Sequence, residues 1–346
     1  MVFSGWKTDI INLPDNKCEK AICPVIVSAS RATDIPAFFA KWFRNRLEAG
    51  YLTWKNPFNT KQFQYISFKK TRIIVFWSKN PKPLIQYLPE IEAKGIHYYF
   101  QFTLNDYEQE KLEPNVPPLV QRIDTFKALS DRLGKKRVIW RYDPLILTNT
   151  ISIDVLVDRI ECIARQLQGY TEKLVISFAD IGIYKKVQNN LTREGVSFRE
   201  FTPPLMIELA ERIQHKAQGW GINITTCAEG VSLDQYGIGH NRCIDDDLMI
   251  ELFNDDSALM NFLGYQPDLF AVYSRPYLKD KGQRKECGCI VSKDIGMYDT
   301  CHHLCKYCYA NTSRKAVENN LRKHDPNSES LIEAGYSRLL SADTNR

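Results

Sequence analysis

Six short runs of apolar and β-branched residues recur along this chain, and longer segments separate them. Runs in which nearly every residue is apolar are typical of strands buried on both faces, as in a parallel sheet. The runs are PVIVSAS (Pro24–Ser30), RIIVFWS (Arg72–Ser78), HYYFQFTL (His97–Leu104), RVIWRY (Arg137–Tyr142), KLVISFAD (Lys173–Asp180) and WGINITT (Trp220–Thr226).

Four of the separating segments carry apolar residues at helical spacing, and two of them end in glycine, a common helix stop. Repeated strand–helix units predict an α/β fold with a parallel sheet, either open or closed. Because there are at least six such units, we expect a full or partial TIM-like (β/α) barrel. The expected helices are Ile35–Gly50, Val120–Gly134, Ile153–Leu167 and Pro203–Gln218.

The chain of 346 residues has the length for one large domain. We expect a barrel-like domain over residues 1–325, including a cysteine-rich region at 287–311, followed by a polar tail over 326–346. No apolar run approaches a membrane-spanning length, and the N-terminus lacks the pattern of a secretory signal. We therefore predict a cytoplasmic protein without a membrane partner. Its ten cysteines should be reduced thiols or metal ligands.

Polar residues follow the expected strands, at the edge where parallel sheets bind their ligands. This pattern is either ordinary loop composition or a site for a charged small molecule. Lys79 in WSKNP and Arg141 in WRYDP lie directly at strand ends. Each can bind a carboxylate or phosphate, or form a salt bridge to an acid such as Asp143 or Asp180.

The stretch CHHLCKYCYAN places Cys301, Cys305 and Cys308 at the spacing C-x3-C-x2-C. Three thiolates on one compact loop can bind three irons of a [4Fe–4S] cluster. The fourth iron is then open to a substrate or cofactor, as a catalytic zinc position is. His302 and His303 lie inside this loop, where they either hydrogen-bond to the cluster or are exposed, and we expect exposure.

The motif C-x3-C-x-aromatic-C, with Tyr307 as the aromatic residue, resembles the signature of the radical S-adenosylmethionine (radical SAM) superfamily. The resemblance implies that the three cysteines ligate the cluster, that S-adenosylmethionine binds the open iron, and that Tyr307 faces the nucleoside. It also implies a 5′-deoxyadenosyl radical that abstracts hydrogen from a substrate the sequence does not specify. The electrons would come from a reductant such as flavodoxin or ferredoxin.

The superfamily places this motif after its first barrel strand, whereas here the motif comes last. A circularly permuted radical SAM barrel accounts for this order, because chain termini often lie close together. The strand before the cysteine loop would then lie beside the strand that leads into SASRATDIP (Ser28–Pro36). In that geometry Arg31 and Asp34 fit a ribose or methionine clamp, and Glu229 is the candidate carboxylate for the methionine amine.

From SASRATDIP through WSKNP and RYDPL to the C-terminal cysteines, the chain resembles a bacterial family, domain of unknown function 1848. The resemblance covers nearly the full length. The family is noted for a C-terminal cysteine cluster like the one at the start of radical SAM enzymes, which is what the motif predicts here.

Four further cysteines flank loops that we expect at the same edge: Cys227, Cys243, Cys287 and Cys289. Four thiolates make one complete site, either a second [4Fe–4S] cluster or an all-cysteine zinc site. Alternatively, Cys227 and Cys243 are merely buried small side chains. Iron–sulfur is favoured over zinc because an auxiliary cluster can relay electrons, whereas zinc cannot change its oxidation state.

The rival interpretation is a non-catalytic protein whose cysteines hold zinc or iron–sulfur, and which binds nucleic acid or carries electrons. The segment Tyr51–Arg72 interleaves aromatic and basic residues, as single-stranded nucleic acid sites do. The same pattern is typical of an edge hairpin with one half-buried face. The net charge of +5 permits a nucleic acid partner without requiring one.

Overall fold

The computed structural model describes residues 3–14, 16–56, 59, 62–265 and 278–333. At its centre is an eight-stranded sheet, and the six apolar runs supply six of the strands. The strands are β3 (Ile26–Ala29), β6 (Ile73–Ser78), β7 (His97–Thr103), β8 (Val138–Leu145), β10 (Lys173–Phe178), β12 (Asn223–Thr226), β13 (Gly239–His240) and β14 (Lys293–Asp294).

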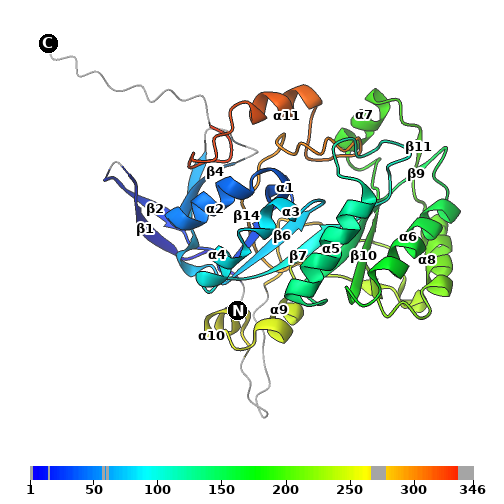
Figure 1. The fold of residues 1–346 in the computed structure, drawn as a ribbon, viewed down its shortest axis with the longest axis horizontal. Helices are drawn as coiled ribbons and strands as arrows, with labels where there is room; N and C mark the ends of the chain where they lie inside the picture. Colours follow the sequence, from blue (N-terminus) through cyan, green and yellow to red (C-terminus); the bar gives the residue numbers. More distant parts are fainter. Residues whose placement is uncertain (1–2, 15, 57–58, 60–61, 266–277, 334–346) are drawn as a thin grey trace.

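The central sheet has the strand order β13-β12-β10-β8-β7-β6-β3-β14 (Figure 1), and every neighbouring pair is parallel. Within the described ranges no pairing joins β13 to β14, so the sheet has two edges. The predicted α/β class with a large parallel sheet is confirmed. The sheet is open, however, and the full barrel is not formed by these strands.

Helices occupy the positions that the apolar spacing predicted, with one interruption. The segment expected as a single helix divides at Phe39 into two helices, the first capped by the Asp34 side chain and the second ended by Gly50 at φ 82°. The helices are α1 (Ile35–Phe38), α2 (Ala40–Ala49), α3 (Lys82–Ile85), α4 (Leu88–Ala93), α5 (Leu119–Leu133), α6 (Ile153–Leu167), α7 (Lys185–Arg193), α8 (Pro203–Lys216), α9 (Asp246–Phe253), α10 (Ser257–Leu263) and α11 (Arg314–Leu321).

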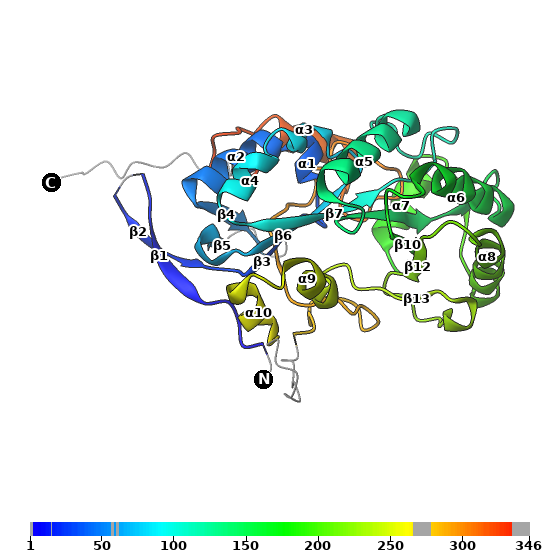
Figure 2. The ribbon, with the colours of Figure 1, turned by 60° about the horizontal axis from the view of Figure 1, so that its bottom comes forward.

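Both faces of the central sheet are covered, which explains why its strands are apolar at successive positions. Ile74 and Phe76 belong to the core formed with the helices of one face, whereas Ile73 and Val75 belong to a second core with α9 and α10. Figure 2 shows α1 to α6 above the sheet and α9 and α10 below it. A closed barrel would turn one face inward, but here α9 and α10 cover that face, and the sheet stays open.

A second, four-stranded sheet has the order β1-β2-β5-β4. Its strands β4 and β5 pair antiparallel, so the hairpin interpretation of Tyr51–Arg72 is confirmed. The Trp54 ring is covered by Lys293, whose Nζ lies 3.3 Å from the ring centroid. Nucleic acid binding stays a prediction. The strands are β1 (Thr8–Asn12), β2 (Cys18–Ile22), β4 (Tyr51–Lys55) and β5 (Phe63–Ser67), and β9 (Leu147–Thr148) pairs separately with β11 (Phe198–Arg199).

The last strand in sequence, β14, lies beside β3, the first strand of the central sheet. Lys293 pairs with Val27 and Asp294 with Ser28, in parallel register. The Asp294 carboxylate also accepts hydrogen bonds from Ser28 Oγ at 3.1 Å and from Arg31 N at 2.8 Å. The neighbour relation expected of a permuted chain is therefore present, and the loops that follow the two strands lie at the same edge.

The packed region extends further than the predicted domain boundary at residue 325. Trp42 Nε1 donates to Ser328 O at 3.0 Å, and Leu331 is buried. Residues 326–333 therefore pack against α2 and do not form part of a polar tail, while residues 334–346 lie outside the described residues. No helix in the described ranges has the length and apolar character needed to cross a membrane.

Candidate functional site

The three-cysteine loop (Cys301–Cys308) lies close to the carboxyl ends of β3 and β6. Its backbone curls tightly, since Leu304 adopts a φ of 55° and Cys308 N donates to Cys305 O at 3.1 Å. Asn190 on α7 donates to Cys308 O at 2.8 Å. Figure 1 shows α7 and α11 at the same end of the molecule. The hydrogen bond from Asn190 thus fixes the end of the loop to α7.

The three thiols of this loop influence one another's ionisation, although their sulfur atoms do not all lie within 4.8 Å of one another. Burial raises the pKa of Cys301 to about 12, and repulsion from Cys308 is the next cause. Burial also raises the pKa of Cys305 well above its usual range, and both other thiols add to the increase. Burial raises the pKa of Cys308 as well, whereas hydrogen bonds from the backbone N–H groups of Asn311 and Ala310 act to lower it. A bound cation would relieve this repulsion, so the donor set fits a metal centre.

His303 anchors the loop to the segment after β3. Its Nε2 lies 2.8 Å from Asp34 Oδ2, and Asp34 also accepts from Ser78 Oγ and Lys79 N, both at 2.7 Å. His303 is only 1% exposed, so the expected exposure of this residue is wrong. His302 is half-buried. Both oxygens of Asp34 contact the protein, and its predicted contact with ribose or methionine stays a prediction.

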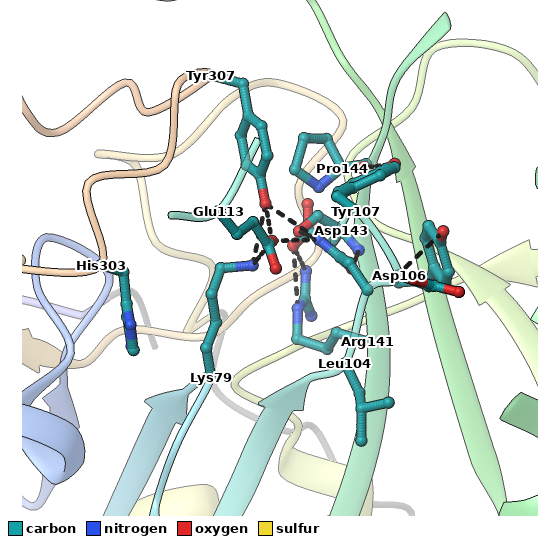
Figure 3. A network of polar contacts seen from close by, with 12 residues as sticks. Lys79, Leu104, Asp106, Tyr107, Glu113, Arg141, Asp143, Pro144, His303 and Tyr307 are labelled. Atoms are coloured by element: carbon teal, nitrogen blue, oxygen red, sulfur yellow. Dashed lines mark hydrogen bonds and ion pairs between the residues drawn. The ribbon is translucent and has the colours of Figure 1, made fainter. Parts of the chain in front are cut away.

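Tyr307 is fixed by a buried polar network at the strand ends (Figure 3). Its Oη donates to Glu113 and accepts from Lys79 Nζ and Asn105 Nδ2, both at 3.1 Å. Asn105 extends the network, since its side chain donates to Asp143 O at 3.1 Å and accepts from Asp143 N at 2.9 Å. The aromatic residue of the cysteine motif therefore has one orientation, set by β6, β7 and β8.

Lys79 and Glu113 form a buried ion pair at the centre of this network. Lys79 Nζ lies 2.7 Å from Glu113 Oε1, and Arg122 Nη1 lies 3.9 Å from Glu113 Oε2. Burial opposes the ionisation of both partners, but their mutual attraction raises the pKa of Lys79 and, with Arg122, lowers the pKa of Glu113. Both groups are therefore charged at neutral pH. The sequence suggested Asp143 or Asp180 as the acid, whereas Lys79 pairs with Glu113.

Arg141 connects the strand ends to the other cysteines. It is 2% exposed, and its Nη1 donates to Cys243 Sγ at 2.8 Å and to Gln101 Oε1 at 3.2 Å. Its Nε donates to Asp143 Oδ2 at 3.0 Å, which confirms the salt-bridge alternative. Burial opposes the charge on Arg141, but Cys243 and Asp143 outweigh that effect and raise its pKa.

The four remaining predicted ligands lie close together, on the side of the central sheet that α9 and α10 cover. The Sγ atoms of Cys227 and Cys243 lie 3.5 Å apart, and Cys243 N donates to Cys289 Sγ at 3.2 Å. Cys287 lies two positions before Cys289, and each thiol affects the pKa of the other. Cys243, Cys287 and Cys289 are buried in the core that contains α9 and α10, and Cys227 packs against it. We call this group the four-cysteine cluster.

The sequence model of the family described as Domain of unknown function (DUF1848) matches residues 26–310. The match runs from β3 through Cys308, and it covers most of the chain. The chain belongs to DUF1848. Neither the curated proteins nor the solved structures that we searched contain a match.

The last two predicted residues of this DUF1848 chain lie near the four-cysteine cluster. The Arg31 guanidinium lies 5.2 Å from the Trp77 ring centroid and pairs with Asp280 at 3.6 Å. Glu229 is buried and accepts from Phe178 N at 3.0 Å. Burial raises the pKa of Glu229 to about 8, against the effect of that hydrogen bond. Roles for Arg31 and Glu229 toward S-adenosylmethionine stay predictions.

Two residues of the Tyr307 network were missed in the sequence. Asn105 directly follows the apolar run His97–Leu104, so the rule that polar residues after strands line sites could have found it. Glu113 lies in the loop sequence KLEPN, which has no local pattern that distinguishes it from surface polarity. Only the tertiary contact with Lys79 identifies Glu113.

Proposed function

We propose that this DUF1848 protein is a radical SAM-type enzyme that holds a [4Fe–4S] cluster on Cys301, Cys305 and Cys308. The supporting observation is a curled loop that carries three cysteines at the carboxyl edge of a parallel sheet, with its aromatic residue fixed in a buried charged network. If bound there and reduced, such a cluster would supply one electron for the cleavage of S-adenosylmethionine, with release of methionine, and so the radical chemistry by which hydrogen is taken from a substrate.

The residues around the loop orient the ligands and control their charge. The Lys79 ammonium lowers the pKa of Cys305, acting against burial, and so favours the thiolate that binds iron. Tyr307 is 6% exposed and held by three partners, so its ring can form a rigid wall beside a bound nucleoside. Rigid positioning of this kind is what radical chemistry requires of the protein.

The outer side of the loop suits an acidic electron donor. A hollow of about 140 Å³ adjoins Cys305, and its charged lining consists of Arg193, Lys306 and Arg314 with one acid, Glu194. Positive surface charge attracts acidic partners and speeds their encounter. The expected reductant of the flavodoxin or ferredoxin class is of this acidic kind.

The test is reductive cleavage of S-adenosylmethionine by the anaerobically reconstituted protein. With dithionite as reductant, we expect release of 5′-deoxyadenosine, measured by chromatography and mass spectrometry. Cys305→Ala should abolish the release, because the loop then offers two sulfurs, while far-UV circular dichroism stays unchanged. Cys162→Ala is the matched control, since this cysteine is exposed on α6.

Two other results would replace the proposal with its rival. Protein that contains iron and sulfide but cleaves no S-adenosylmethionine would be an electron carrier. Protein that contains zinc and no iron after anaerobic purification would be a non-catalytic metal-binding protein.

A further inference from the structure

Three separate loops contribute to the four-cysteine cluster. Cys227 follows β12, Cys243 follows β13, and Cys287 and Cys289 precede β14. Backbone N–H groups of Cys243 and Ile244 both point at Cys289 Sγ, at 3.2 and 3.4 Å. Thiols that only fill space do not require several donors directed at one sulfur, whereas metal-bound thiolates accept such hydrogen bonds. The arrangement therefore indicates ligands and not packing alone.

The charges around the cluster support the same conclusion. Arg141 is buried and pairs with one carboxylate, that of Asp143. It also donates to Cys243 Sγ at 2.8 Å. The Nη2 atom of Arg31 is buried and has no hydrogen-bond partner in the described part of the chain. Burial opposes the charge of Arg31, but Cys289 and Cys243 are among the groups that raise its pKa. A buried guanidinium (Arg141) and a partly buried one (Arg31) are costly unless negative charge lies beside them. Metal-bound thiolates would supply that charge.

We propose that Cys227, Cys243, Cys287 and Cys289 form a second, closed [4Fe–4S] site whose negative charge is balanced by Arg31 and Arg141. Four thiolates complete the coordination of a cubane and leave no open iron. The site therefore binds no substrate directly, and its function is electron storage or relay. The site shares no cysteine with the three-cysteine loop, so each site can bind its metal without the other.

Iron–sulfur is favoured over zinc because a closed cluster can relay electrons to the three-cysteine loop, whereas zinc cannot change its oxidation state. In a zinc site with Zn–S bonds of about 2.3 Å, all sulfur–sulfur separations are roughly 3.8 Å. Cys227 and Cys243, with Sγ atoms 3.5 Å apart, are close to that separation, but no third cysteine sulfur in the described chain lies within 4.8 Å of both, and metal analysis of the reconstituted protein decides between zinc and iron–sulfur.

Arg141 also joins the two cysteine sites. The connection runs from Cys243 Sγ to Arg141 at 2.8 Å and from Arg141 Nε to Asp143 at 3.0 Å. It continues from Asp143 N to Asn105 at 2.9 Å and from Asn105 Nδ2 to Tyr307 at 3.1 Å. Four hydrogen bonds thus link the closed site to the aromatic residue of the three-cysteine loop. Arg141 acts as a positioning residue for both sites.

The test isolates the closed site by removing the other one. We expect the triple variant Cys301→Ala/Cys305→Ala/Cys308→Ala, reconstituted anaerobically, to retain about four irons and four sulfides per chain. Its reduced form should show the electron paramagnetic resonance signal of a [4Fe–4S] cluster. Adding Cys243→Ala should remove both, whereas adding Cys162→Ala should change neither.

A folding defect is separated from ligand loss by the single variant Cys243→Ala in the full chain. This variant should keep about four irons on the three-cysteine loop. Arg141→Met in the triple variant should lower the midpoint potential of the remaining cluster, because a positive charge beside the sulfurs is lost. Iron-free triple variant, or zinc in place of iron, would overturn the proposal. Failure of S-adenosylmethionine cleavage would leave these results intact.

Discussion

At the scale of single residues, Gly296 shows how closely the last strand approaches the first. A Cβ atom at this position would overlap Ser30 Oγ and lie 2.6 Å from Ser30 Cβ. The Ser30 hydroxyl cannot retreat freely, because it accepts from Ala32 N at 2.9 Å and from Thr33 N at 3.3 Å. The turn after β14 therefore requires glycine for close packing against the loop after β3.

We expect Gly296→Ala to lower the free energy of unfolding by about 1–3 kcal/mol, the usual effect of overpacking. Urea denaturation of the purified protein measures the change. Gly230→Ala is the control, since an added Cβ there meets nothing within 4 Å. Combining Gly296→Ala with Ser30→Gly should restore much of the loss. A single Gly296→Ala variant as stable as the parent would contradict the steric argument.

At the scale of elements, Asp256 ties α10 to the central sheet. Its carboxylate lies 2.7 Å from Arg72 Nη2 and 3.1 Å from His97 Nε2, and it caps α10 by accepting from Leu259 N at 3.0 Å. Burial alone would raise the pKa of Asp256, but the contacts with Arg72 and Leu259 outweigh burial and lower it. The Asp256 carboxylate therefore stabilises the attachment of α10, which covers one face of the central sheet.

The direction of that pKa shift sets a pH dependence. Because the folded-state pKa of Asp256 lies below the unfolded value, its contribution is complete above about pH 4 and is lost as the pH falls further. Asp256→Asn should lower the free energy of unfolding at pH 7, because it removes the charge that pairs with Arg72. We expect a loss of only about 1–3 kcal/mol, since Arg72 is partly exposed and water replaces part of the interaction. Urea titrations from pH 3 to 7 should show a shallower acid loss in this variant. Asp255→Asn, at an exposed neighbour, should behave like the parent protein.

At the scale of the whole molecule, the chain is weakly basic, with a net charge of +5. Part of this charge lines the hollow beside Cys305. If an acidic protein delivers electrons there, its encounter rate depends on local charge and falls with added salt. The dependence of the reduction rate on surface charge therefore tests the electron donor separately from the chemistry of the cluster.

Arg314→Glu should slow reduction by flavodoxin about three- to tenfold at low ionic strength, with little effect at high salt. Stopped-flow absorbance of the cluster measures the rate. Arg165→Glu is a closely matched control, because both arginines are well exposed and each pairs with a glutamate one helical turn away. Equal rates for the two variants would exclude this face as the docking surface.

The sequence alone determined much of the fold and part of the site. The runs around Ile74 and Val175 are apolar at successive positions, so their identity as buried parallel strands was readable from a local pattern. The spacing of Cys301, Cys305 and Cys308 confines three thiols to one loop whatever the fold. The convergence of the other four cysteines followed from one rule, that loops at the carboxyl ends of parallel strands meet.

Only the tertiary structure decided the rest. Whether the sheet closes depends on whether α9 and α10 cover its second face, and no spacing within the strands encodes that. The burial of His303 depends on Asp34, and the charge of Lys79 depends on Glu113, each far away in the chain. Periodicity reports on neighbours along the backbone, whereas ion pairs in a low-dielectric interior join groups that only the folded chain brings together.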